Sequence, residues 1–280
     1  MRNAIGAEDV LEIERKVNAA KRKVLDMGVS AGKGHITSAY SCAEVVAVLY
    51  YKILRISPKE PHWENRDRFV MSKNHGSLML YPILADLGFF DPAELDTFMA
   101  DGTRLGGHSK LCLPGVDFAG GSLGIGLGVA AGMAYAAKMD QKDWLTFCLI
   151  GDAECYEGAI WEAAMLAGHH RLNNLITILD RNRLGVTGFT EDLLRLMPLA
   201  DKWTAFGWEV REVNGHSVQE LLLTLSDLCD SKRDRPLMVI ANTTKGYGID
   251  FMSDMPLCHG ETPKAQDIPR AYAQLEVNQY

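Results

Sequence analysis

Apolar residues in the first third of the chain recur every three or four positions, which is the spacing of one face of a helix. Such a series begins at Val10 and predicts a helix over about 10–27, with Gly28 as its C-terminal stop. Pro58 and Pro61 predict a loop farther along. Other apolar patterns predict a short strand at 69–71 and helices over about 41–53, 76–87 and 92–100.

The second half of the chain alternates buried strands with helices. Apolar runs predict strands over 145–150, 175–179 and 237–241, and a further strand is predicted over 208–213. Helical patterns lie between them, over about 155–169, 191–206 and 217–229. This alternation predicts an α/β fold, a mostly parallel sheet with helices on both faces, built as a single domain over 1–280.

Residues 101–124 fit neither pattern, because they are rich in glycine and include Pro114. They predict a long structured loop, and such loops are often functional. A helix rich in Gly and Ala follows over about 124–138, and its small residues predict a buried position. Gly126 and Gly128 also fit a loose dinucleotide-binding pattern, but no strand precedes them and no acidic residue follows at the expected distance. Close packing of the helix is the better interpretation.

Charge and cysteine content exclude several classes of protein. The net charge of −7 argues against nucleic acid as the main partner, since phosphate binding needs clustered Lys and Arg. No apolar run approaches the ~18 residues that span a bilayer, and the first residues do not resemble a secretory signal. None of the six cysteines forms a CxxC pair, so a reduced, cytoplasmic protein is expected.

Polar residues follow two of the predicted strands directly. Asp152 comes just after the strand 145–150, and Asn182 follows the strand 175–179. Adjacent parallel strands would bring both to one edge of the sheet, where their oxygens suit Mg²⁺ or Ca²⁺. A helix beginning at residue 153 would favour a diphosphate. These residues alone also fit a simple turn with a helix cap.

Several segments resemble transketolases. The stretch from Gly151-Asp152 to Asn182 is similar to the thiamine-diphosphate motif, which starts with Gly-Asp-Gly and ends on an Asn after the next strand. Further segments resemble the same family in its order: 66–76, 158–168, Gly34-His35, Gly107-His108, Gly121–Gly124 and His259-Gly260. The resemblance covers essentially the whole chain and implies a thiamine-diphosphate-binding α/β fold.

The resemblance also implies a role for individual residues. Mg²⁺ or Ca²⁺ would be held by Asp152, Asn182 and the carbonyl of Leu184. Thiamine diphosphate would contact His75, Gly121, Leu123, Gly151, Asp152, Ala153 and Asn182. The catalytic group would be His35 and His259 for proton handling, His108 for the terminal hydroxyl of the donor, and Glu157 in a carboxylate network at the interface between subunits. The other histidines, His62, His169, His170 and His216, match nothing in the family and are interpreted as structural.

Two positions depart from the family pattern. Ala153 stands where the family usually has Gly, which would strain the chain if that residue needs a positive φ. Cys258 precedes His259, where related chains often carry a large residue, and this exchange would reshape the pocket.

The chain is predicted to hold only the diphosphate-binding domain of a transketolase, about half of the full enzyme. The pyrimidine-binding and C-terminal domains are expected on a separate chain, in a heterotetramer. The implied reaction transfers a two-carbon ketol unit from a ketose, such as a sugar phosphate, to an aldose. One alternative is a subunit of a thiamine-diphosphate-dependent 2-oxo acid decarboxylase or dehydrogenase, although the four histidines favour sugars. Another is a non-catalytic homologue.

Overall fold

A parallel five-stranded sheet lies at the centre of the computed structural model, which describes residues 6–230 and 233–277. The strands are β1 (Arg68–Met71), β2 (Thr146–Gly151), β3 (Leu175–Arg181), β4 (Glu209–Asn214) and β5 (Leu237–Asn242). Their order across the sheet is β1-β2-β3-β5-β4, and every pairing is parallel. The α/β fold with a parallel sheet is therefore confirmed.

Side chains alternate between the two faces of the sheet, and each face has its own core. Phe147, Leu149 and Ile178 belong to one buried cluster, while Cys148 and Ile150 belong to the other. Strands that are buried on both faces read as continuous apolar runs, which is why the sequence located them well.

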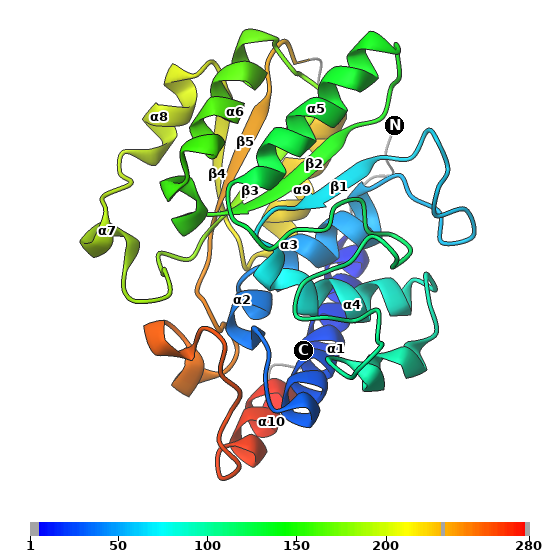
Figure 1. The fold of residues 1–280 in the computed structure, drawn as a ribbon, viewed down its shortest axis with the longest axis vertical. Coiled ribbons are helices and arrows are strands. Elements are labelled where there is room, and N and C mark those ends of the chain that lie inside the picture. Colours follow the sequence, from blue (N-terminus) through cyan, green and yellow to red (C-terminus); the bar gives the residue numbers. More distant parts are fainter. Residues whose placement is uncertain (1–5, 231–232, 278–280) are drawn as a thin grey trace.

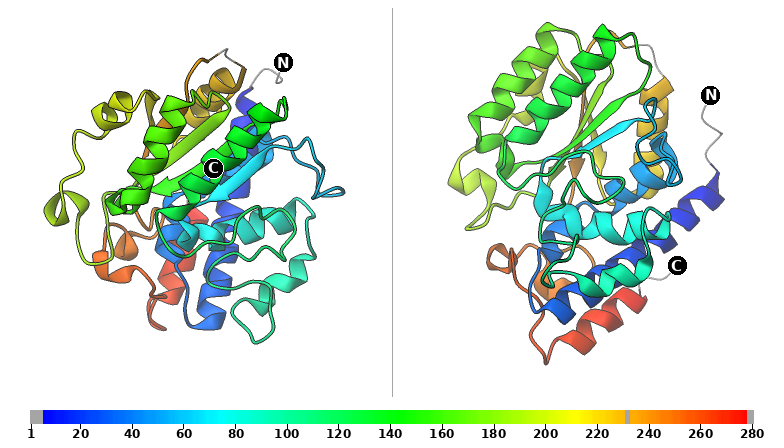
Figure 2. Two further views of the ribbon diagram at one scale, coloured as in Figure 1. Left: turned by 45° about the horizontal axis from the view of Figure 1, so that its top comes forward. Right: turned by 45° about the vertical axis from the view of Figure 1, so that its right-hand side comes forward.

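Helices cover both faces of the sheet (Figure 1). One cluster joins the sheet to α5 (Ile125–Met139), α6 (Gly158–His169) and α8 (Leu199–Ala205). The other joins it to the N-terminal helices, α9 and α10. These are α1 (Ala7–Ala31), α2 (Ile36–Ser41), α3 (Ala43–Val48), α4 (Ser77–Asp86), α9 (Val218–Asp230) and α10 (Ile268–Val277). Figure 2 shows the same layers from two further directions.

The first helix is longer than predicted. Gly28 does not end it, because α1 continues to Ala31 and stops at Gly32, which has a φ of 64°. Gly28 instead allows close packing: a Cβ there would lie 2.6 Å from Cδ1 of Ile36. The next helical region also begins earlier than predicted, at Ile36, and closes with a π-helical turn over Leu49–Ile53.

The predicted helix over 191–206 is wrong as a single element. It is divided into α7 (Thr190–Leu193) and α8, which begins after Pro198. Proline has no amide hydrogen and restricts the residue before it, so it can precede a helix but not continue one.

Four smaller differences concern helical segments. The predicted helix over 92–100 is a 3-10 turn over Pro92–Thr97. The predicted helix over 155–169 is a 3-10 turn over Ala153–Tyr156 followed by α6. The helix α5 is buried on one face only, and its Gly128 and Gly132 are exposed. The helix α10 was not predicted.

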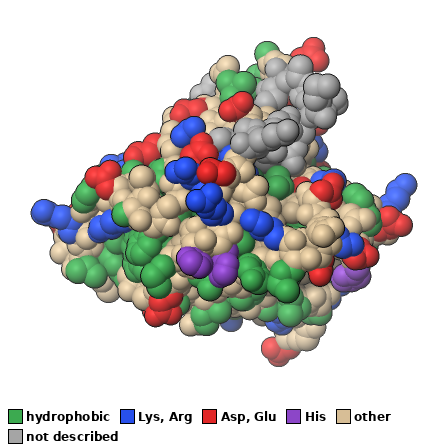
Figure 3. Space-filling view, turned by 90° about the horizontal axis from the view of Figure 1, so that it is seen from above, with side chains coloured by type: hydrophobic (Ala, Val, Ile, Leu, Met, Phe, Trp, Pro, Cys, Tyr) green, Lys and Arg blue, Asp and Glu red, His purple; other side chains and the backbone are tan. Residues whose placement is uncertain are grey.

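The surface shows mixed charge where it can be seen. On the face in Figure 3, acidic and basic side chains are interspersed, and hydrophobic side chains gather along one side. Among the described residues, no helix is long and apolar enough to cross a membrane.

Candidate active site

The carboxyl ends of β2 and β3 bring the predicted metal residues together. The two strands are neighbours, with Gly151 paired to Asp180. One carboxylate oxygen of Asp152, Oδ2, accepts a hydrogen bond from the amide of Arg183 at 2.5 Å. The amide of Leu184 donates to Oδ1 of Asn182 at 3.0 Å. Asp152, Asn182 and Leu184 thus share one small region at the edge of the sheet.

Asp152 is a buried carboxylate that forms no ion pair with the described residues. Its side chain accepts hydrogen bonds from the backbone N–H groups of Ala153 and Arg183. Burial, and then the neighbouring charge of Asp180, raise the pKa of Asp152 to about 7. A buried charge is stable only when it is paired, so this site favours binding of a cation.

Asp180 is different, because it already has a partner. Lys73 donates to its Oδ2, Ser41 donates to both oxygens at 2.8 Å, and Thr243 donates to Oδ1. Burial alone would raise the pKa of Asp180, but the charge and hydrogen bond of Lys73, together with the hydrogen bonds from Thr243 and Ser41, outweigh it and lower that pKa. The ion pair between Lys73 and Asp180 therefore lies at the base of the site. Neither Lys73 nor Ser41 was predicted from the sequence.

Glu154 joins the end of β2 to the glycine-rich loop. It accepts hydrogen bonds from the hydroxyl of Ser72, from the amide of Gly124 at 2.8 Å and from the amide of Gly151 at 3.0 Å. Burial is the main reason that the pKa of Glu154 is raised. This carboxylate was not predicted either, since its importance depends on a loop thirty residues away in the chain.

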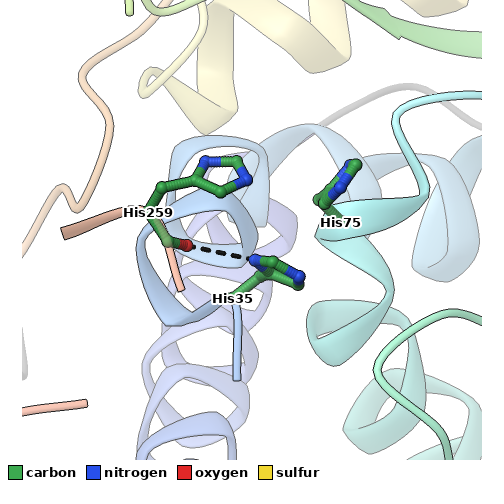
Figure 4. A group of neighbouring side chains, drawn as sticks. All are labelled: His35, His75 and His259. Atoms are coloured by element: carbon green, nitrogen blue, oxygen red, sulfur yellow. Dashed lines mark hydrogen bonds between the residues drawn. The ribbon is translucent and has the colours of Figure 1, made fainter. Parts of the chain in front are cut away.

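Four histidines meet beside this region, as Figure 4 shows for three of them. The ring centroid of His35 lies 4.7 Å from that of His75, 5.8 Å from His108 and 4.9 Å from His259. His35 also uses Nδ1 in a hydrogen bond of 3.1 Å with the carbonyl of His259. The four histidines that the sequence selected therefore form one cluster, although they are far apart along the chain.

Three of the four histidines are harder to protonate than an ordinary histidine. Burial, and then the charge of nearby groups, lower the pKa of His75 and that of His259 to about 3. The pKa of His108 is also lowered, mainly by burial. Its Nε2 atom is buried and has no hydrogen-bond partner among the described residues, so it remains available to a ligand.

A cation would be unfavourable within the histidine cluster itself. Nitrogen atoms of His35, His75 and His259 lie within 4.8 Å of one another, which is a possible metal-binding arrangement. However, the ammonium group of Lys245 lies 3.0 Å from Nδ1 of His259. No carboxylate belongs to this group of three, and the positive charge of Lys245 disfavours a metal ion there. An anionic or polyhydroxylated ligand suits these residues better.

Lys245 was missed by the sequence analysis. It is buried, and it also donates to the carbonyl of Gly185 at 3.3 Å. Burial, and then repulsion from Lys73, lower the pKa of Lys245 to about 8. An anion beside it would relieve this repulsion. The only signal in the sequence was its position shortly after the last strand.

The remaining predicted residues lie around the same edge. Gly121, with a φ of 149°, sits beside the ring of His108, since a Cβ on it would be 3.7 Å from that ring. Leu123 is partly buried in the same loop. Glu157 is exposed, and a Cβ added to Gly124 would lie 2.6 Å from the Cβ of Glu157.

The alanine at position 153, where the family usually has glycine, causes no backbone strain. Ala153 lies in the 3-10 turn after β2, and it is not among the described residues with a positive φ. Its amide donates to Oδ1 of Asp152 at 2.8 Å. The predicted helix start at residue 153 is only this short turn, so its support for an anion is smaller than a full helix would give.

Comparisons with known proteins agree with this geometry. Residues 13–280 match the family "Transketolase, thiamine diphosphate binding domain". An apulose-4-phosphate transketolase subunit of Phocaeicola vulgatus is 39% identical over 267 residues, which are 95% of this chain and 94% of that protein. The 6-deoxy-6-sulfo-D-fructose transketolase subunit SqwG of a Clostridium species is 37% identical, over 96% of this chain and 98% of that protein.

Full-length transketolases match over only part of their length. Human transketolase is 40% identical over 88% of this chain and 40% of its own length. The crystal structure of transketolase from Campylobacter jejuni superimposes with a TM-score of 0.88 at 32% identity, covering 94% of this chain and 42% of that one. The chain therefore belongs to the transketolase family, as a member of its thiamine-diphosphate-binding domain group.

Proposed function

We propose that this chain is the diphosphate-binding subunit of a two-subunit transketolase that transfers a two-carbon ketol unit from a ketose, such as a sugar phosphate, to an aldose. One observation carries the proposal. A buried acidic edge and a cluster of four histidines lie side by side in a chain whose relatives of equal length are named transketolase subunits.

The acidic edge fits a hard divalent cation, Mg²⁺ or Ca²⁺. Asp152 supplies a buried carboxylate, Asn182 an amide oxygen and Leu184 a carbonyl. Such cations prefer oxygen ligands and often share phosphate oxygens of a cofactor. These three residues would hold the ion, and the ion would in turn neutralise Asp152.

Lys245, by its charge, and the neutral ring of His75, by a hydrogen bond, fit a diphosphate. Lys245 is buried with a lowered pKa, and His75 lies close to the same region. We infer that Lys245, His75 and the residues at Gly151–Ala153 hold the diphosphate, while Gly121 and Leu123 face the aminopyrimidine. Thiamine diphosphate, when bound, supplies the electron-accepting centre that breaks and forms the carbon–carbon bond.

Three histidines, His35, His108 and His259, would bind the sugar. Because the pKa of His259 is low, its ring is neutral at pH 7 and can donate one hydrogen bond and accept another, which suits hydroxyl groups. We assign His35 and His259 to protons at the oxygen of the reacting carbonyl, and His108 to the terminal hydroxyl of the donor. The buried Nε2 of His108, which lacks a partner among the described residues, supports its assignment.

We further propose that a second chain with the pyrimidine-binding domain completes the site, in a heterotetramer. Glu157 is exposed at the edge of the site, where it can join a carboxylate network across that interface. A cytoplasmic location is proposed too, because the five cysteines whose side chains are described are all free thiols.

Calorimetry of thiamine diphosphate binding tests the proposal directly. The cofactor and Mg²⁺ are titrated into this chain alone and into this chain mixed with its candidate partner. We expect tight binding in the mixture, together with ketol transfer from a ketose phosphate. Absence of cofactor binding in both samples would support the non-catalytic alternative instead.

A further inference from the structure

A second buried network of charged groups lies behind the site, between α1, α3 and the turn after β4. Nζ of Lys21 donates to Oε1 of Glu44 at 2.6 Å, and Nδ1 of His216 lies 2.9 Å from Oε2 of the same carboxylate. Lys21 and Glu44 are almost fully buried, and the His216 side chain is only 9% exposed. Burial would raise the pKa of Glu44, but Lys21 and His216 outweigh it and lower that pKa. Glu44 is thus an anion.

The second ring nitrogen of His216, Nε2, accepts a hydrogen bond from the backbone. Its Nε2 atom accepts a hydrogen bond of 2.8 Å from the backbone amide of Thr244. An amide always donates, so Nε2 carries no hydrogen and the hydrogen of the ring lies on Nδ1, facing Glu44. The ring of Tyr247 stacks on His216, with centroids 3.7 Å apart and planes inclined by 16°. Both the tautomer and the orientation of His216 are therefore fixed.

Thr244 lies between two residues that reach into the site. The side chain of Thr243 donates to Asp180, and that of Lys245 contacts His259. The turn before His216 packs closely here, since a Cβ on Gly215 would lie 2.3 Å from Cγ2 of Thr243. The Thr244 amide therefore lies in the backbone directly between two side chains that enter the site.

We propose that His216 is a positioning residue for the cofactor site: it holds the Thr244 amide and thereby places the ammonium group of Lys245. Glu44 selects the tautomer that can accept this hydrogen bond, and Lys21 balances the buried charge of Glu44. The inference rests on the proposed function, because Lys245 is assigned to the diphosphate of the cofactor. The contacts of His216 described above are with Glu44, Thr244 and Tyr247, so it acts through Lys245 rather than on the substrate.

Two substitutions separate the two hydrogen bonds of His216. In His216→Gln, the amide oxygen takes the place of Nε2 and can still accept from Thr244. In His216→Asn, the shorter amide takes the place of Nδ1 and can still donate to Glu44, but it does not reach Thr244. We expect thiamine diphosphate to bind His216→Asn about 10-fold to 100-fold more weakly than wild type, and His216→Gln to remain within about threefold.

Val218→Ala provides the control for stability. Val218 is buried and lines the same small cavity as His216, so its truncation weakens packing without removing the hydrogen bond to Thr244. We expect a lower melting temperature and an unchanged cofactor affinity. If cofactor affinity follows the melting temperature in all three variants, His216 is only structural and the proposal is wrong.

The tautomer can be measured in the wild-type protein, even if a variant does not fold. Long-range ¹H–¹⁵N spectra at neutral pH distinguish an imidazole protonated at Nδ1 from one protonated at Nε2. We expect Nδ1–H, and a hydrogen found on Nε2 would overturn the proposal. If the wild-type chain with its partner binds no cofactor, the proposed function fails; if it binds and His216→Asn binds equally well, only this inference fails.

Discussion

The charge state of Asp152 determines how pH affects the candidate site. Its pKa is raised to about 7 by burial and by Asp180, so the carboxyl group is largely protonated below that pH. A divalent cation must displace this proton to bind. We expect metal-dependent binding of thiamine diphosphate to weaken as the pH falls through about 7, with Asp152 releasing about one proton at pH 6 and none at pH 9.

Calorimetry in two buffers with different ionisation enthalpies counts these protons. The matched control is Asp152→Asn, which keeps the size of the side chain but removes the charge and the titration. We expect cofactor binding to this variant to be independent of Mg²⁺. Binding that still requires Mg²⁺ with wild-type affinity would contradict the assignment of Asp152 as a metal ligand.

The histidine cluster makes a second prediction at the residue scale. The pKa of His75 is about 3 in the folded chain, because of burial and then of His35, whereas the ordinary value of a histidine pKa is 6.5. Between these two values the unfolded chain binds the proton and the folded chain does not. The free energy of unfolding should therefore fall as the pH decreases from about 6.5 toward 3.

Urea denaturation at several pH values measures this effect. At pH 5 each such histidine adds about one proton to the uptake on unfolding. We expect His75→Gln to reduce the slope of the unfolding free energy against pH by up to the contribution of one proton. An equal slope in both proteins would mean that His75 is protonated in the folded state.

Residues of the site could be predicted only where local sequence carries the signal. Asp152 and Asn182 follow strands directly, so the parallel sheet itself indicates that they share one edge. Lys245 and Glu154 gave no such signal. Their roles arise from contacts with His259 and with Gly124, and these contacts exist only after the loops have packed.

At the scale of elements, α5 carries a matched pair of glycines. A Cβ on Gly126 would lie 2.4 Å from Oγ of Ser72 and 2.7 Å from its Cα, whereas a Cβ on Gly128 would meet nothing within 4 Å. We expect Gly126→Ala to destabilise the chain by about 1–3 kcal/mol, since the helix must move away from Ser72. Gly128→Ala should stabilise it by about 0.4–1 kcal/mol, because alanine loses less backbone entropy in a helix.

Thermal unfolding of the two variants compares these effects in one helix. Ser72 donates to Glu154, so Gly126→Ala should also weaken cofactor binding while Gly128→Ala leaves it unchanged. Equal melting temperatures for both variants would show that α5 can shift from β1 at no cost.

The elements that the sequence predicted well are those with one simple cause. Strands buried on both faces are mostly apolar, and the predicted bounds of all five strands lie within two residues of the observed ones. Helix ends were predicted less accurately. Gly28, for example, allows close packing against Ile36 and does not end the helix. The helix α10 was not predicted, because much of its stabilisation comes from contacts with α1, such as the hydrogen bond between Tyr272 and Asp26.

At the scale of the whole molecule, exposed hydrophobic side chains flank the site. Leu194 is 62% exposed in the segment that follows Leu184, and Leu257 is 83% exposed two residues before His259. Others in these two segments are Val186, Phe189, Leu193, Met197 and Met255. Exposed apolar side chains gathered in this way are typical of protein interfaces, and both segments are continuous in the chain with predicted metal and catalytic residues. This arrangement favours a partner chain that covers the site rather than one that binds elsewhere.

Charged substitutions in these segments test the whole-molecule arrangement. We expect Leu194→Asp and Leu257→Asp each to weaken association with the partner about tenfold or more, because a charge would be buried in an apolar interface. The melting temperature of the isolated chain should hardly change, since both side chains are already in water.

Leu223→Asp is the matched control: Leu223 is also exposed, but it lies on α9, away from these two segments. Sedimentation of each variant with the partner measures the affinity. If Leu223→Asp weakens association while the other two do not, the partner binds at α9 rather than at these two segments, and the arrangement proposed here is wrong.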